Sequence, residues 1–183
     1  LKVLIVDAKP SAGFSVESTG LITVRTRQEF AEFFPIDRYI TNPITSICVV
    51  APGFKDYFIS KTDHAWIFQT DTKGLIKNLA ETLPKNVMLM SGASLTNVHL
   101  SGKEIQSITV LKGGATLHVQ TRFLVGADGG HSRVAQLCHL DRNKRFLIGY
   151  EKVFFGRVHL GPQPEETIYH YWFGEFSLGY GGW

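Results

Sequence analysis

Runs of apolar residues alternate with polar stretches along the whole chain, and their pattern separates strands from helices. Residues 1–10 (LKVLIVDAKP) form an unbroken apolar run that ends at Asp7 and stops at Pro10. A run without alternation predicts a strand that is buried on both faces, as in a parallel sheet. The run NVMLMSGA at 86–93 predicts a second buried strand of the same kind.

Helical spacing appears in three places. The segment at 26–34 carries three phenylalanines on one side, Thr26 as a plausible cap, and Pro35 directly after it. The segment at 70–84 places four aliphatic side chains at helical spacing and is capped near Thr70–Thr72. A short helix is expected at about 131–138.

Short runs of β-favouring residues fill most of the rest. Residues 44–70 contain three such runs separated by Pro-Gly and Thr-Asp, which predicts antiparallel strands. Four strand-like pieces follow one another from 95 to 128, the last being RFLVGAD at 122–128, and the glycine-containing turns between them predict a meander. Aromatic strands return between 147 and 183.

The order of these elements predicts an interleaved α/β chain with two lobes and a cleft between them. Residues 1–43 and 71–145 form the α/β lobe, and residues 44–70 and 146–183 form a lobe of antiparallel sheet. The chain has 183 residues, of which 44% are hydrophobic and 19% charged, so that a folded core is expected. The aromatic content mildly favours an apolar ligand site.

The net charge and the two cysteines give only weak indications about binding partners and compartment. The formal net charge is only +3, and the densest basic run, DRNKRF at 141–146, is interpreted as a solvated loop rather than a nucleic-acid site. Cys48 and Cys138 belong to no CxxC pair, which makes a reducing, cytoplasmic compartment the default. No stretch is apolar enough to cross a membrane.

The stretch GADGGHS at 126–132 has the strongest chemical signal. Gly126, Gly129 and Gly130 allow the backbone to approach a ligand or adopt positive φ. The turn leads into a helix whose first N–H groups favour anionic groups such as phosphate. Ser132 caps that helix or donates to a phosphate. The alternative is a strand–turn–helix corner in which Asp128 serves only as a cap.

Weaker signals lie elsewhere. An acid at the end of a strand, such as Asp7, accepts hydrogen bonds from ribose hydroxyls in dinucleotide folds, although any polar strand end looks similar. Arg25 and Arg27 are either within reach of a pyrophosphate or simply solvent-exposed. The aromatic run at 169–173 is either ordinary sheet packing or a wall for an apolar substrate. No metal-ligand spacing and no GxSxG elbow is present.

The sequence FLVGADGGHSRV at 123–134 resembles the Asp-Gly fingerprint of FAD-dependent oxidoreductases of the glutathione-reductase-like superfamily, which includes aromatic hydroxylases and geranylgeranyl reductases. STGLITVR (18–25), DTKGLIKNLAE (71–81) and the aromatic end at 169–183 look most like the geranylgeranyl-reductase branch. The resemblance implies an FAD-binding Rossmann-like sheet with a β-meander, joined to a substrate lobe. It assigns cofactor contacts to Asp7, Asp128 and Gly129. Further candidate cofactor contacts are Lys9, Arg25, Gly126 and Ser132, and candidate substrate contacts are Tyr171, Phe173 and Tyr180.

The sequence also departs from the superfamily. It contains no GxGxxG, and the superfamily's later Gly-Asp-Ala motif would fall beyond Trp183, so a fragment truncated at both ends is expected. The implied function is reduction of C=C bonds in an apolar isoprenoid or lipid substrate by FAD, with NAD(P)H as a candidate electron donor and peripheral membrane contact as a candidate property. A flavin-dependent aromatic hydroxylase and an interaction module that binds no flavin are the alternatives. No catalytic residue is assigned.

Overall fold

The computed structural model of the chain describes residues 1–146, 149, 152, 166–172 and 180–182. It separates into two compact units, each built from two stretches of chain. The first unit comprises residues 1–15 and 76–152, and the second comprises residues 16–75 and 153–183. The units are therefore interleaved along the sequence.

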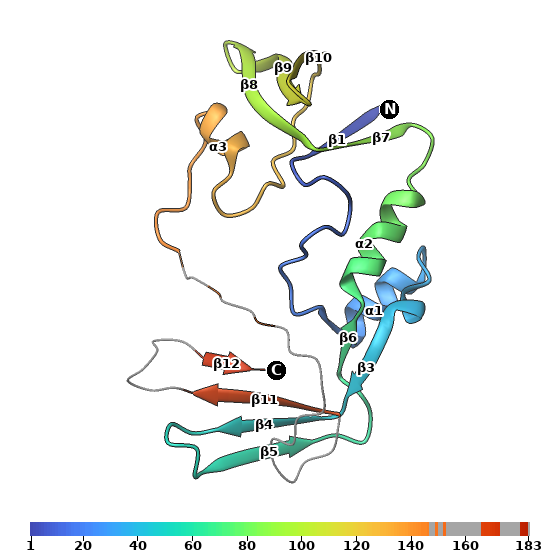
Figure 1. Ribbon diagram of the computed structural model, residues 1–183, viewed down its shortest axis with the longest axis vertical. Helices are drawn as coiled ribbons and strands as arrows, with labels where there is room; N and C mark the ends of the chain where they lie inside the picture. Colours follow the sequence, from blue (N-terminus) through green and yellow to red (C-terminus); the bar gives the residue numbers. More distant parts are fainter. Residues whose placement is uncertain (147–148, 150–151, 153–165, 173–179, 183) are drawn as a thin grey trace. The chain divides into compact units, whose positions relative to one another are not determined.

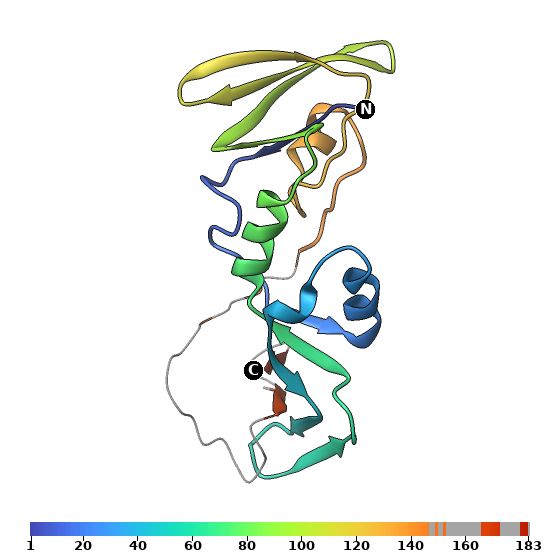
Figure 2. The ribbon, with the colours of Figure 1, turned by 90° about the vertical axis from the view of Figure 1, so that its right-hand side faces the viewer.

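Two sheets make up the first unit (Figure 1). Strand β1 (Val3–Asp7) pairs in parallel with β7 (Val87–Ser91), from Val3 opposite Val87 to Asp7 opposite Ser91. Strands β8 (Ala93–Ser101), β9 (Glu104–Lys112) and β10 (Ala115–Gln120) form an antiparallel meander in the order β10-β9-β8. Figure 2 shows the three strands side by side, with α3 (Arg133–Leu137) next to them.

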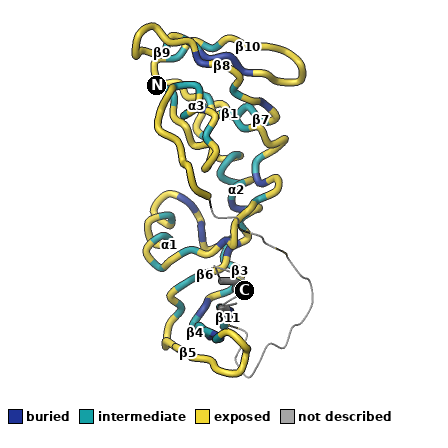
Figure 3. Tube along the Cα trace, turned by 90° about the vertical axis from the view of Figure 1, so that its left-hand side faces the viewer, coloured by how far each residue is buried: buried dark blue, intermediate teal, exposed yellow. Residues whose placement is uncertain are grey.

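The core of the first unit lies against one face of the meander. Figure 3 shows buried segments on the meander. The apolar core residues there lie on β8 and β9: Ala93, Val98, Ile108 and Val110. Val6, Leu124 and Leu137 pack against this cluster from β1, the segment before the glycine turn, and α3. One apolar cluster thus ties together the end of β1 and both sides of the turn.

The fourth strand expected in the meander does not form. Residues 122–126 take an irregular conformation, with Leu124 turned to the core while Phe123 and Val125 are 79% and 84% exposed. A strand is stabilised by pairing its backbone groups, and no described strand pairs with this segment. The expectation that β1 is buried on both faces is also wrong within the described residues, because β1 pairs only with β7 and leaves Val3 and Ile5 exposed.

The second unit begins with a small antiparallel sheet in the order β2-β6-β3. Its strands are β2 (Leu21–Thr23), β6 (Ile67–Thr70) and β3 (Ile40–Ile44). Helix α1 (Val24–Ala31) follows β2, and a 3₁₀ turn, η1 (Ile36–Tyr39), comes before β3. The cap of α1 is Thr23 rather than the predicted Thr26, since the Thr23 hydroxyl accepts the backbone N–H of Thr26.

A four-stranded sheet in the order β12-β11-β4-β5 completes the second unit. Strands β4 (Ser46–Val50) and β5 (Tyr57–Lys61) are antiparallel, as expected, and so are β11 (Thr167–Trp172) and β12 (Tyr180–Gly182). However, β11 runs parallel to β4, so the sheet is mixed rather than purely antiparallel. The strand expected at 148–160 lies outside the described residues, apart from residues 149 and 152.

The boundary between the units falls inside α2 (Thr72–Glu81), whose first turn is capped by the Asp71 carboxylate accepting from the Gly74 N–H. Residues 16–43 lie with the second unit, although the sequence pattern groups them with the first. The reason is that β2 and β3 pair with β6, and the Gly20 carbonyl accepts hydrogen bonds from Thr70. Among the described residues, no helix has the length and apolarity needed to cross a membrane.

Candidate functional site

The glycine turn at 126–130 joins the extended segment 123–125 to α3 in the first unit. Gly126 packs directly against the helix, since a Cβ at this position would lie 2.9 Å from the Cβ of Val134. Gly129 has φ +83°, in the left-handed region that L side chains rarely adopt, and no atom lies within 4 Å of where its Cβ would be. Gly126 is thus required for close packing, whereas Gly129 is required for backbone shape and leaves open space beside it.

The Asp128 side chain holds this turn together. Its Oδ1 accepts from the Ser132 hydroxyl at 2.6 Å, and its Oδ2 accepts from the backbone N–H groups of Arg133 at 2.6 Å and Val134 at 3.0 Å. Burial alone would raise the pKa of Asp128, but these hydrogen bonds outweigh it and hold that pKa below its ordinary value. The carboxylate is therefore ionised at neutral pH and engaged within the turn.

Ser132 is the N-cap of α3, the first of the two roles predicted for it. Its Oγ accepts from the Ala135 N–H at 3.0 Å while its hydroxyl hydrogen is donated to Asp128. Asp128 and Ser132 together satisfy three of the first N–H groups of a helix that is only five residues long. Both side chains thus shape the turn, and the surface left for a ligand is backbone.

The fit of the expected cofactor can be judged at this backbone. No described residue accepts a hydrogen bond from the N–H groups of Gly129, Gly130 or His131. Successive unpaired N–H groups beside an open glycine are suited to phosphate or hydroxyl oxygens. The residues present therefore fit a pyrophosphate or polyol such as those of FAD, through backbone contacts rather than through the Asp128 carboxylate.

Asp7 ends β1 in the same unit as the turn. Its Oδ1 accepts from the Lys9 N–H at 3.0 Å, which leaves acceptor capacity on the carboxylate. Its neighbour Val6 and the turn's neighbour Leu124 pack in the same apolar cluster. Lys9 donates from Nζ to the Ser15 carbonyl at 2.7 Å, so its ammonium supports the loop after β1.

Arg25 lies in the second unit, on α1, and its exposed guanidinium forms an ion pair with Glu29 at 2.8 Å. The neighbouring Arg27 makes a two-point contact with Asp37, at 2.7 and 3.0 Å, and stacks over the Phe68 ring. The hydrogen bond from Arg27 holds the pKa of Asp37 below its ordinary value. The structure gives both arginines protein partners, and a cofactor role for Arg25 stays a prediction.

The residues predicted to contact substrate belong to the four-stranded sheet of the second unit. Tyr171 is buried opposite Val50, and Tyr169 is buried opposite Cys48, which gives this face an aromatic and aliphatic lining. Burial, with smaller contributions from Tyr169 and Cys48, raises the pKa of Tyr171, so that its phenol stays neutral at physiological pH. Phe173 and the side chain of Tyr180 lie outside the described residues.

Three residues beside the turn were not predicted from the sequence to belong to the site. Asn143 donates from Nδ2 to the Gly130 carbonyl at 3.2 Å, and the His131 ring stacks on Phe146 with ring centroids 4.1 Å apart. The Phe146 ring is 3.4 Å from the position a Gly130 Cβ would take. The run at 141–146 is exposed, as predicted for a solvated loop, and its contacts with the turn could not be predicted from its composition.

Comparisons with known proteins agree with this geometry. Residues 43–175 match the family described as FAD binding domain. A geranylgeranyl bacteriochlorophyll reductase-like protein from Thermoplasma acidophilum has a TM-score of 0.70 at 16% identity, over 94% of this chain and 44% of that one. The probable FAD-dependent monooxygenase pqsL from Pseudomonas aeruginosa has a TM-score of 0.57 at 18% identity, over 80% and 41%.

The flavin-dependent monooxygenase PieE, whose structure holds FAD and substrate, has a TM-score of 0.60 at 13% identity, over 76% of this chain and 28% of that one. No curated protein matches the sequence. Identities this low establish a shared fold, which is α/β with parallel and antiparallel sheets of the FAD-binding Rossmann-like type. The chain spans less than half the length of these solved structures.

Proposed function

Because the chain belongs to the FAD-binding domain family, whose match covers residues 43–175, we propose that the protein is an FAD-dependent oxidoreductase that reduces C=C bonds of an apolar, isoprenoid or lipid substrate. The observation that carries the proposal is the glycine turn at 126–130, which Asp128 braces and whose backbone includes N–H groups with no acceptor among the described residues. The likeness to a geranylgeranyl reductase-like protein supports the reductase branch of the glutathione-reductase-like superfamily.

FAD is the cofactor of this family; when bound and reduced by NAD(P)H it would supply a hydride to one carbon of a polarised C=C bond, whose other carbon would take a proton from solvent. In the proposed arrangement Asp7 binds ribose hydroxyls, and the backbone of Gly129 and Gly130 binds the pyrophosphate and ribityl region. Asp128 acts as a positioning residue, since its carboxylate shapes the turn. The apolar face around Tyr171 excludes water and holds the substrate, and NAD(P)H is the proposed electron donor.

A flavin-dependent aromatic hydroxylase is the second candidate, and the similarity to pqsL and PieE supports it. The two reactions leave different marks on the substrate. Reduction adds hydrogen without oxygen, whereas hydroxylation inserts an oxygen atom and requires O₂. The aromatic lining around Tyr169 and Tyr171 suits either an isoprenoid chain or an aromatic ring.

The first test is to titrate FAD into the purified chain and follow flavin fluorescence. We expect saturable quenching that Asp128→Ala weakens at least about tenfold, because the turn loses three hydrogen bonds and its shape. Asp63→Ala, which removes an exposed carboxylate in the second unit, serves as the matched control. Absence of saturable quenching in the unmodified chain would favour the interaction-module alternative over a flavoprotein.

A second measurement separates the two oxidoreductase candidates. The FAD-loaded protein is incubated with geranylgeraniol and dithionite in the absence of oxygen, and the product is analysed by mass spectrometry. The reductase proposal predicts a product that has gained only hydrogen. A product that contains one more oxygen atom, formed from an aromatic substrate only when O₂ and NADPH are supplied, would replace the reductase with the hydroxylase.

A further inference from the structure

A pocket of about 310 Å³ lies in the first unit, beside the end of the glycine turn. Its wall is formed by the end of the turn and by the loop after α3: Gly130, His131, Leu140, Asp141, Arg142, Asn143, Lys144 and Phe146. The volume falls at the lower end of the range for small-molecule sites, which is roughly 300–1,000 Å³. Neither the proposed cofactor contacts nor the proposed substrate contacts include this loop.

The pocket has a flat aromatic part. The rings of His131 and Phe146 are nearly parallel, with an angle of 19° between their planes and 4.1 Å between their centroids. Phe146 also lies beside Gly130, at ordinary van der Waals distance from the position that a Cβ there would take. The hydrogen bond from Asn143 to the Gly130 carbonyl ties the loop to the turn at the same place. The aromatic pair is thus held by contacts from both sides and offers a planar surface to a ligand.

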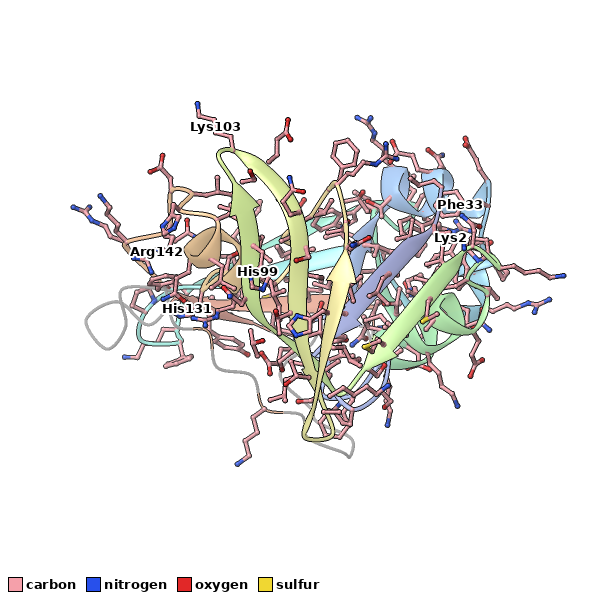
Figure 4. All side chains as sticks on the ribbon, turned by 90° about the horizontal axis from the view of Figure 1, so that it is seen from above. Lys2, Phe33, His99, Lys103, His131 and Arg142 are labelled. Atoms are coloured by element: carbon pink, nitrogen blue, oxygen red, sulfur yellow. The ribbon has the colours of Figure 1, made fainter. Side chains whose placement is uncertain are left out.

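The pocket also has a positive part. Arg142 and Lys144 both line it, and they outnumber the one carboxylate there, Asp141. Figure 4 shows His131 and Arg142 close to each other, with Lys103 on a separate loop of the meander. None of these cationic side chains forms an ion pair within the part of the chain that the structure describes. Guanidinium and ammonium groups bind phosphate and carboxylate through charge-assisted hydrogen bonds.

We propose that this pocket is a second binding site, for a small aromatic anion in which a ring carries a phosphate or carboxylate group. The ring lies against the His131–Phe146 pair, and the anionic group is bound by Arg142 and Lys144. The site goes beyond the proposed flavin chemistry and does not depend on it. Because its wall includes Gly130, a bound ligand contacts the same turn that is assigned to FAD.

The test uses phenyl phosphate, which shares no part with FAD except a phosphate, and follows the backbone amide NMR signals of the ¹⁵N-labelled chain. We expect saturable shifts centred on Gly130, His131 and Asn143. Inorganic phosphate and phenol should each bind at least about tenfold more weakly, because each retains only one half of the interaction. Equal affinity for phosphate and phenyl phosphate would overturn the proposal.

Two variants of the same loop test whether Arg142 and Lys144 bind the anionic group of the ligand. The double variant Arg142→Gln/Lys144→Gln should bind phenyl phosphate about tenfold more weakly. Arg145→Gln removes the same charge from a neighbouring residue that does not line the pocket, and should bind within about twofold of the unmodified chain. These side chains are exposed, so all variants should fold. Equal losses in both variants, or shifts centred away from the pocket, would refute the site.

Discussion

Gly126→Ala is expected to weaken both the fold of the first unit and its binding of FAD. The added Cβ would lie 2.9 Å from the Cβ of Val134, an atom fixed to the backbone of α3, so the turn or the helix must shift. Overpacking of this kind costs about 1–3 kcal/mol in the free energy of unfolding. Since the shift displaces the backbone N–H groups of the turn, we expect FAD affinity to fall at least about tenfold.

Gly130→Ala is the matched control, because it adds the same methyl group four residues later. There the Cβ would lie 3.4 Å from the Phe146 ring and 3.9 Å from Nδ2 of Asn143, which are ordinary contacts. Urea unfolding should place this variant within about 0.5 kcal/mol of the unmodified chain. If both alanine variants lose stability equally, the close packing of Gly126 against α3 is not what the turn requires.

Asp128→Asn is expected to destabilise the first unit by about 1–2 kcal/mol at neutral pH, the usual cost of losing a charged helix cap. The amide keeps the shape of the side chain but loses the charge. It also directs N–H hydrogens at one of the three donors that the carboxylate accepts. The magnitude rests on the hydrogen bonds rather than on the pKa shift, because Asp128 is exposed and solvent screens its charge.

The pH dependence of that loss follows from the lowered pKa of Asp128. A carboxyl whose pKa is lower in the folded state contributes its full stability above its unfolded pKa, about 3.9, and loses that contribution as pH falls through the folded value. The difference in the free energy of unfolding between the unmodified chain and Asp128→Asn should therefore be constant from pH 7 to about 5. It should become smaller below about pH 4. Urea unfolding across this pH range measures this difference in the free energy of unfolding, with Asp63→Asn as the control. If the difference is unchanged at the lowest pH, the charge of Asp128 does not contribute to stability.

Much of the first unit could be predicted from the sequence because its signals are local. The apolar runs at 1–10 and 86–93 became the parallel pair β1 and β7, and the Gly-Gly turn at 113–114 marks a hairpin with both residues at positive φ. The glycines at 126–130 predicted a turn with positive φ or close backbone packing. What local pattern could not provide was the partner of each polar group, and so the engagement of Asp128 with α3 appears only in three dimensions.

The errors have a common cause, which is pairing between residues far apart in the sequence. Residues 122–128 have strand composition, yet a strand forms only where another offers its backbone, and none of the described strands does so. Residues 16–43 look like part of the first lobe until β2 and β3 pair with β6. The loop at 141–146 is exposed, as predicted, but the hydrogen bond of Asn143 and the stacking of Phe146 could not be predicted from composition.

The parallel pairing of β11 with β4 has a consequence for how the chain reaches its native state. Ser46 and Thr167, which bond to each other through their hydroxyls in that pair, are separated by 121 positions. The entropy of closing so long a loop must be overcome before this contact stabilises anything, and such topologies fold slowly. During synthesis, β4 and β5 leave the ribosome long before β11, and until then the edge of β4 that pairs with β11 stays unpaired. The second unit therefore completes its sheet last, and its aromatic face takes shape only after the glycine turn of the first unit has been made.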